Sequence, residues 1–532
     1  MRHRALAIGA IAAVAVLAAA VYLAVRADPA AAPDIQPSPT PPPAVVAAVR
    51  SPVARENQLA GTPGWEITSP ALDGQIQAYA GQTSVQAGET LDLYVSTAGP
   101  NARYDVAIYR MGWYHGIGAR LVRSVDNVPG SDQGNWTPAH GLQRCRTCSL
   151  DPATLLVQAN WKRSLQIGIG ADWVSGYYLA RLRERKSGTE TYAVFVVRDD
   201  ASTAPILVQA PTNTWEAYNT WGDASLYGSF RADRRYVPKT RRAHRVSYDR
   251  PYDPTLRNRR NYGAGEFFNW EVNFVRWAES RGYDMTYTTN VDVSQHGATL
   301  LRHRLFVSLG HDEYWTSGER DAVEAARDAG VSVAFLGGNE AYWQVRLEPA
   351  AGGAPARILA AYKDAALDPI ARTDPKGSTS LFADRPVERP ESLLSGLAYG
   401  SNATPGQQPW RPATLDSWVF AATGIKAGAA FPGIVGYEYD RMPPPTLRPP
   451  GLVAVGFSPV RGYMGADIAI SSLYRAPSGA FVFNAGTVAW AWGLDDYGHE
   501  AEGRFADDRL RRMTANILDR LSATATVGTT GS

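Results

Sequence analysis

The chain has 532 residues, of which 45% are hydrophobic and 20% charged, the composition of a folded globular protein rather than a disordered one. At that length we expect about two or three domains. Lys and Arg together number 53 and Asp and Glu 51, so the net charge of +2 argues against a dedicated nucleic-acid-binding surface.

The first 26 residues have the pattern of an export signal. Basic residues at Arg2 and Arg4 precede an apolar run from Ala5 to Val25. A run of that length can cross a bilayer as a helix, and its basic flank predicts that the rest of the chain is exported. We interpret residues 1–26 as a signal anchor, with a cleaved signal peptide as the alternative. The protein is then held in the cell membrane by a single span, with its folded part outside, or it is secreted.

A linker rich in Pro and Ala follows at residues 27–60. Its densest stretch, Pro37–Pro43, contains five prolines. Such a segment cannot build a core, and it is typical of an extended spacer between a membrane and a folded domain.

The chain has two cysteines, Cys145 and Cys148. A structural metal site would need more Cys or His residues nearby. In an exported protein the short spacing favours a local disulfide, while a redox-active pair and two free thiols remain the alternatives.

Residues 65–200 alternate apolar and polar side chains with a period of two. Leu91, Leu93 and Val95 show this alternation, and the run Tyr192–Val197 closes the region. Turn residues separate several such runs, which indicates an antiparallel sheet. We predict an immunoglobulin-like β-sandwich, which either spaces and orients the next domain or binds glycan.

Strands and helices alternate in the region from residue 204 to 525. Buried strands are predicted at Ile206–Gln209, Leu305–Leu309 and Val331–Leu336, and helices at about 266–281, 317–329 and 505–521. This alternation predicts a mostly parallel α/β domain of the Rossmann or flavodoxin type. The expected fold class is therefore multidomain, with a hydrophobic N-terminal helix, an antiparallel sandwich and this α/β domain. Residues 350–465 are harder to assign because Pro and Gly are frequent there.

Polar and aromatic residues follow three of the predicted strands, where ligands bind in parallel sheets. His311 and Glu313 are two residues apart at a strand end, so both side chains can project to one side while Asp312 points to the other. An imidazole beside a carboxylate suits a metal ligand with a proton-handling neighbour. The alternative is a helix-capping histidine, with Glu313 paired to an arginine.

Several other kinds of catalytic site are missing from the sequence of this region. It contains no P-loop and no Gly-x-Ser-x-Gly nucleophile motif, and both cysteines lie outside it. Zinc sites usually require several His or Cys ligands. A metal bound here would find mainly carboxylate and phenolate oxygens, which are hard ligands that suit a ferric ion.

Strings in this region resemble the large subunit of N,N-dimethylformamidase and its relatives: Ala217–Asn219 with Ser225–Tyr227, His311–Trp315, and Gly337–Trp343. The resemblance extends over roughly residues 205–500. In that family one iron is held by two tyrosinates and a glutamate, and it activates water for amide hydrolysis. Here the resemblance implies a ferric ion bound by Tyr218, Tyr227 and Glu313, with His311 as the neighbouring base.

Some assignments within this resemblance have alternatives. Tyr248 is the rival to Tyr227 as the second tyrosine ligand. Asn219, Asn339 and Glu340 are candidates for contacting the substrate, and the alternative is that such residues order their loops by hydrogen bonds. Asp312 stands where the family often has Pro, which leaves the substrate open.

The function expected from the resemblance is iron-dependent hydrolysis of an amide-type C–N bond in a small molecule. One alternative is a non-catalytic envelope protein that binds glycan or another ligand. A second alternative is a hydrolase that acts on carbohydrate through Glu313 and Glu340.

Overall fold

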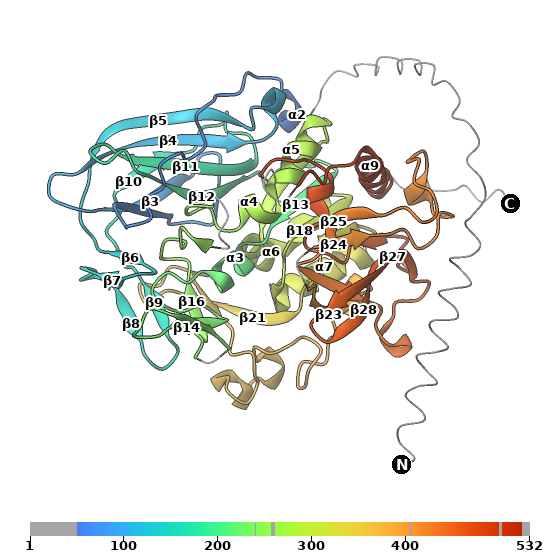
Figure 1. Ribbon diagram of the computed structural model, residues 1–532. Helices are drawn as coiled ribbons and strands as arrows, with labels where there is room; N and C mark the ends of the chain where they lie inside the picture. The colour runs from blue at the N-terminus through green and yellow to red at the C-terminus, as the bar shows by residue number, and fades with distance from the viewer. Residues whose placement is uncertain (1–50, 240, 257–260, 405–406, 499–502, 524–532) are drawn as a thin grey trace, which may run out of the picture. The chain divides into compact units, whose positions relative to one another are not determined.

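We describe a computed structural model of the chain, which defines residues 51–239, 241–256, 261–404, 407–498 and 503–523 (Figure 1). The segment 1–26, where the hydrophobic helix is predicted, and most of the linker 27–60 lie outside these residues. Within the described ranges no helix combines the length and the apolar character that a membrane crossing requires.

Two sheets form the first part of the described chain. A three-stranded antiparallel sheet contains β1 (Ile76–Ala80), β3 (Thr90–Thr97) and β10 (Leu165–Gly168). A five-stranded sheet has the order β2 (Ser84–Gln86), β12 (Glu190–Arg198), β11 (Gly176–Glu184), β4 (Arg103–Met111) and β5 (Ala119–Pro129). One apolar core joins the two sheets, because alternate side chains such as Leu93, Ile108 and Phe195 point into it.

Two short hairpins extend from this part. They are β6 (Asn135–Thr137) with β7 (Gly141–Gln143), and β8 (Ser149–Asp151) with β9 (Leu156–Gln158). A disulfide joins Cys145 and Cys148 between the hairpins, with their Cα atoms 5.3 Å apart. Both cysteines pack against an aromatic cluster that includes Trp136 and Trp221, so the hairpins contact the loop that follows β13.

The largest sheet has seven strands. Its order is β17 (Met285–Thr289), β13 (Ile206–Ala210), β18 (Leu305–Gly310), β20 (Ser332–Gly337), β29 (Phe481–Asn484), β28 (Gly465–Arg475) and β27 (Val453–Gly462). The first five strands are mutually parallel, and β28 and β27 continue the sheet as an antiparallel hairpin. Among the helices beside it are α5 (Val272–Ser280), α6 (Asn290–His296), α7 (Ser317–Asp328) and α9 (Asp508–Ser522).

The prediction of a large Rossmann-like or flavodoxin-like α/β domain is wrong. The structure is 35% strand and 19% helix. In the described ranges the strands divide among nine sheets, most of them small. The parallel strands belong to a mixed sheet, and α6, between β17 and β18, has seven residues. The alternation of strands and helices that led to this prediction stops after β20, and the strands that follow, up to residue 441, belong to small sheets.

Small sheets surround the carboxyl ends of the parallel strands. One has the order β16 (Arg245–Ser247), β22 (Ile358–Ala360), β21 (Trp343–Glu348) and β19 (Tyr314–Thr316). Three others pair β23 (Ala398–Asn402) with β26 (Glu438–Arg441), β24 (Gln408–Trp410) with β25 (Phe431–Val435), and β14 (Gly228–Phe230) with β15 (Tyr236–Pro238). These sheets bring residues from distant parts of the chain to the end of β18.

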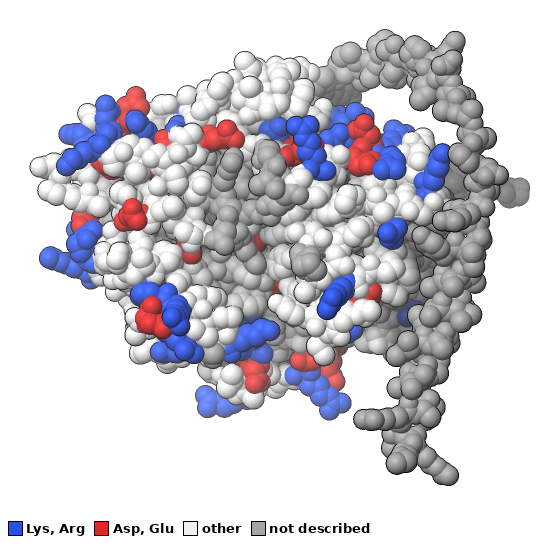
Figure 2. Space-filling model, in the orientation of Figure 1, with Lys and Arg blue, Asp and Glu red and all other residues white. Residues whose placement is uncertain are grey.

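A buried ion pair joins the first sheets to the seven-stranded part. The guanidinium of Arg110 on β4 donates two hydrogen bonds to Glu279 on α5, at 2.9 and 3.0 Å, and both side chains are fully buried. The described residues, from 51 to 523, form one compact unit. The separate domains drawn at 65–200 and 204–525 therefore stay a prediction. On the face drawn in Figure 2, basic and acidic side chains are interspersed.

Candidate metal centre

Two tyrosines from different loops converge on Glu313, just beyond β18. Tyr218, the last residue of α3 (Thr212–Tyr218), donates its hydroxyl to Glu313 Oε2 at 3.1 Å. The Tyr227 hydroxyl lies 2.6 Å from both carboxylate oxygens of Glu313. The two rings stack with their centroids 4.3 Å apart. The structure therefore brings together the three residues that the resemblance implies as metal ligands.

A buried arginine holds the loop that carries the two tyrosines. Arg250 donates to the Glu216 carboxylate and to the backbone carbonyls of Trp221 and Ala224. Both Arg250 and Glu216 are shielded from solvent. These hydrogen bonds fix the loop between Tyr218 and Tyr227. The loop reverses the direction of the chain, so Tyr227 lies beside Tyr218.

Asn219 takes part in the same loop and does not reach Glu313. Its side-chain amide donates to the Pro251 carbonyl at 3.0 Å, and its oxygen accepts from the backbone N–H groups of Trp221 and Asp253. The side chain is fully buried. This position does not fit the predicted substrate contact, and it fits the alternative of loop ordering.

Tyr248, the rival ligand, also lies elsewhere. Its hydroxyl donates to Asn213 Oδ1 at 2.5 Å, and the guanidinium of Arg357 lies over its ring. Tyr227 is therefore the tyrosine that meets Glu313.

The side chain of His311 projects to the same side of the backbone as that of Glu313 and joins the group that Glu313 forms with the two tyrosines. Its Nε2 atom lies 3.0 Å from Glu438 Oε2 and 3.4 Å from Glu313 Oε2, without a well-aligned hydrogen bond to a described residue. His311, Glu313 and Glu438 each offer a ligand atom, and these three atoms lie within 4.8 Å of one another. Burial disfavours the imidazolium, but the charges of Tyr437 and Glu438 outweigh it and raise the pKa of His311 well above its ordinary value.

Glu438 was missed in the sequence, because it lies on β26 in the region that resisted assignment. Strand β26 pairs with β23, so Asn402 lies opposite Glu438 and donates to its Oε1 atom at 3.4 Å. Asn339 donates to the other oxygen at 2.9 Å. Asn339 was predicted to contact the substrate, but here it orients Glu438. No local motif marks Glu438, since its role depends on pairing between distant strands.

Lys363 is a second residue that the sequence did not reveal. Its ammonium lies 3.6 Å from the ring centroid of Tyr227, 4.7 Å from that of Trp343 and 5.0 Å from that of Tyr314. Burial lowers the pKa of Lys363 to about 7, and the negative charge of Glu313 opposes that shift. In its protonated form, the lysine places a positive charge at the face of a candidate ligand.

Asp312 points to the opposite side and forms a separate group, the buried carboxylate cluster, with Glu319 and Glu340. Asp312 accepts hydrogen bonds from Gln209, Asn290 and Ser308. Glu340 accepts from Ser308 at 3.2 Å and is 1% exposed. Burial raises the pKa of all three carboxyl groups. Glu340 therefore lies away from Glu313, in a position that does not fit the predicted substrate contact.

The residues around Glu313 fit a ferric ion. Two phenol oxygens, two carboxylates and an imidazole are grouped there, and hard oxygen donors of this kind match a highly charged cation. Burial, followed by the charge of Glu313, raises the pKa of Tyr227 well above its ordinary value. A bound cation reverses this effect, because it stabilises the phenolate form.

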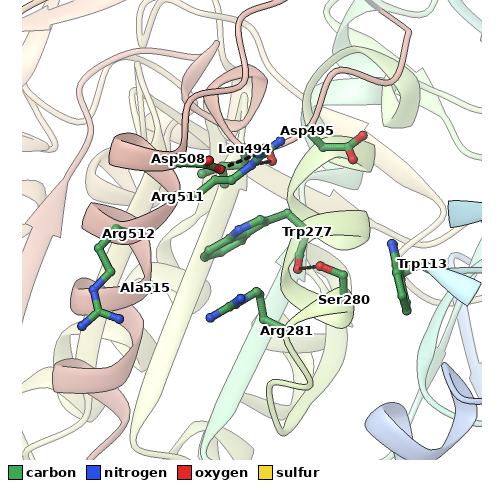
Figure 3. Close-up of a pocket in the computed structure, with 10 residues that line it drawn as sticks. All are labelled: Trp113, Trp277, Ser280, Arg281, Leu494, Asp495, Asp508, Arg511, Arg512 and Ala515. Atoms are coloured by element: carbon green, nitrogen blue, oxygen red, sulfur yellow. Dashed lines mark hydrogen bonds and ion pairs between the residues drawn. The ribbon is translucent and has the colours of Figure 1, made fainter. Parts of the chain in front are cut away.

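A pocket of about 460 Å³ lies elsewhere, between α5 and α9 (Figure 3). Trp277 and Arg281 line it from α5 and its end, and Arg512 lines it from α9. None of the candidate metal ligands borders this pocket.

Comparisons with known proteins agree with the geometry. A family model described as N,N-dimethylformamidase beta subunit-like, C-terminal, matches residues 105–503. The N,N-dimethylformamidase beta subunit of Alcaligenes sp is 26% identical over 228 residues, which is 36% of this chain and 29% of that relative. The match thus spans less than a third of the relative's length. All the candidate ligands lie within the range that the family model matches.

Proposed function

This chain belongs to the N,N-dimethylformamidase beta subunit-like family, and from that premise we propose that it is an iron-dependent hydrolase of an amide-type C–N bond. The observation that carries the proposal is the convergence of Tyr218 and Tyr227 on Glu313. These residues would hold the metal. Bound there, a ferric ion supplies a Lewis acid that polarises the amide carbonyl and lowers the pKa of water.

His311 and Glu438 handle protons in this proposal. Hydrolysis forms a C–O bond, breaks the C–N bond and transfers a proton from water to the leaving nitrogen. In such a reaction one side chain can accept the proton from water first and donate it to the leaving nitrogen later. His311 Nε2 and Glu438 Oε2 lie 3.0 Å apart, so a proton can pass between the imidazole and the buried carboxylate once the two groups are aligned.

Two other residues hold Glu313 and Tyr227 in place. The indole N–H of Trp343 donates to Glu313 Oε1 at 2.9 Å, which fixes the orientation of the carboxylate. Glu313 is also anchored through its backbone N–H, which donates to Thr214 Oγ1. Lys363 covers the Tyr227 ring. Fixed ligands of this kind reduce the reorganisation that binding a metal or a substrate requires.

We also propose that the folded part functions outside the cell. The apolar run at residues 5–25 and the Cys145–Cys148 disulfide support this location, since disulfides persist in oxidising compartments. A site built from phenolate and carboxylate oxygens does not require free thiols.

The direct test is metal analysis combined with amide turnover. We expect purified protein to contain about one iron per chain, to absorb visible light through phenolate-to-iron charge transfer, and to release amine from N-methylformamide. Protein that stays colourless and metal-free after reconstitution with iron contradicts the metal proposal. Turnover that persists fully in the presence of a strong chelator favours hydrolysis by carboxylates alone.

A further inference from the structure

Three aromatic side chains extend outward from the candidate metal centre. Trp343 is tied to Glu313 by its indole N–H, and the ring of Tyr342 lies 5.3 Å from the Trp343 ring. The ring of Tyr399 lies a further 5.1 Å from that of Tyr342. We refer to Tyr342, Trp343 and Tyr399 as the aromatic strip.

The backbone holds the strip against the centre. The N–H groups of Tyr342 and Trp343 both donate to the carbonyl of Glu313, at 3.0 and 2.9 Å. Tyr399 lies on β23, which pairs with the strand that carries Glu438. Each end of the strip is thus fixed to a candidate catalytic residue, so the fold sets the position of the strip relative to the candidate metal centre.

The three strip side chains are partly exposed, whereas the neighbouring Tyr314 and Trp315 are fully buried. Burial, with added contributions from the charges of Glu438 and Glu313, raises the pKa of Tyr399, as expected for a phenol close to the centre. Partly exposed aromatic rings beside a reactive group offer flat apolar surface to a ligand.

Two polar atoms of the strip are already occupied. The Tyr399 hydroxyl donates to Asn402 Oδ1 at 2.9 Å, and the Trp343 indole donates to Glu313. Lys363 already lies over the Trp343 ring, so the strip offers a ligand mainly the rings of Tyr342 and Tyr399. A flat ring with few hydrogen-bonding groups matches this surface better than a sugar, whose hydroxyls need several free partners.

We propose that the aromatic strip is a subsite for a planar apolar ring carried by the amide substrate. The inference rests on the proposed function, and it extends that function by assigning a substrate class. The methyl groups of a small amide can cover one ring at most, whereas the neighbouring rings of Tyr342 and Tyr399 provide surface for an aryl substituent. The substrates are therefore aryl-bearing amides rather than dimethylated ones.

The test compares two formamides that differ in the ring alone, N-benzylformamide and N-methylformamide. In wild-type protein we expect the ratio of their kcat/KM values to be at least about 10, because stacking on one or two rings contributes roughly that factor. In the double variant Tyr342→Leu with Tyr399→Leu we expect the ratio to fall to about 1–2. Tyr463→Leu is the matched control, since Tyr463 is 75% exposed at the turn between β27 and β28.

A binding measurement separates this inference from the proposed function. Calorimetry on metal-free protein should show N-benzylformamide binding that weakens about tenfold in the double variant and is unchanged in Tyr463→Leu. Turnover of both amides with a ratio near 1 overturns the subsite and leaves the hydrolase. Binding that depends on the strip without any turnover keeps the subsite and removes the hydrolase. Binding of N-acetylglucosamine in place of N-benzylformamide overturns the assigned ring chemistry.

Discussion

Two separate groups of acidic side chains lie at the end of β18. They are on opposite sides of the backbone segment His311–Glu313. On one side, the hydroxyls of Tyr218 and Tyr227 surround Glu313. On the other, Asp312 shares the buried carboxylate cluster with Glu319 and Glu340. The groups differ in their hydrogen-bond donors, and under the proposed function that difference assigns the cation to the Glu313 side.

The buried carboxylate cluster is supplied with neutral donors. The side-chain amides of Gln209 and Asn290 each bond to both Asp312 and Glu319. Amides cannot lose a proton to become metal ligands, and burial favours the protonated form of these carboxyls. Around Glu313 two of the donors are phenols, which become anionic ligands when a cation displaces their protons, and the third is the indole of Trp343. We therefore propose different roles for two neighbouring residues, Asp312 in the fold and Glu313 in metal binding.

The comparison predicts the largest effect for Glu313→Gln. The substitution keeps the size of the side chain and removes its charge, so we expect iron binding to weaken by more than about 100-fold, beyond the usual cost of losing an outer partner. Iron content and amide turnover should fall together. The matched control is Asp312→Asn, in the buried carboxylate cluster. Equal iron loss in both variants would remove the distinction between the two groups.

Glu438→Gln should have the next largest effect. We expect kcat to fall about 10- to 100-fold, in the range of a lost proton-transfer partner, while iron content is retained. His311 would keep a neighbour of the same size but lose one of the charges that, after that of Tyr437, raise its pKa. Steady-state kinetics and metal analysis on one preparation check both parts. Complete loss of iron would instead identify Glu438 as a ligand.

At Asp312 we expect a substitution to lower the stability of the fold and to leave iron binding unchanged. Asp312→Ala leaves hydrogen-bond donors of Gln209, Asn290 and Ser308 without one of their acceptors, and should reduce the free energy of unfolding by about 2 kcal/mol. Iron content per folded chain should not change. Urea unfolding measures the first quantity and metal analysis the second. An unchanged unfolding free energy would show that the cluster does not stabilise the fold.

Lys363→Met should have the smallest effect. When protonated, the lysine places a positive charge over the Tyr227 ring and stabilises electron density on it. Without this charge, the phenolate-to-iron absorption band should move to longer wavelength. Lys363→Arg should keep the band in place. A band that does not differ between the Met and Arg variants contradicts an electrostatic role.

The regular elements near the site followed from sequence patterns. The strand at Leu305–Gly310 and the helix at Ser317–Asp328 agree with prediction to within about one residue, since a buried apolar run and a capping box at Thr316 define them. The helix predicted over 266–281 divides at Glu271 into α4 (Phe267–Trp270) and α5. Glu271 is fully buried there, and the Trp215 indole donates to it. The periodicity of apolar residues in the sequence cannot reveal such a contact between distant residues.

The candidate site was only partly predictable. Tyr218, Tyr227 and Glu313 came from strings that resemble a family, and the structure brings them together. Glu438 and Lys363 lie in stretches of short strands and loops, where neighbouring residues give no periodic signal. Their positions depend on strand pairing across distant parts of the chain, such as β23 with β26. The residues that complete this site required tertiary structure.

The central claim is that Tyr227, and not Tyr248, shares a metal with Glu313. The most direct measurement is the visible absorption spectrum and iron content of Tyr227→Phe beside Tyr248→Phe. The account predicts that Tyr227→Phe loses most of the charge-transfer band, while Tyr248→Phe keeps it and loses only about 1 kcal/mol of stability with its hydrogen bond to Asn213. An intact band in Tyr227→Phe, or its loss in Tyr248→Phe alone, would contradict the account.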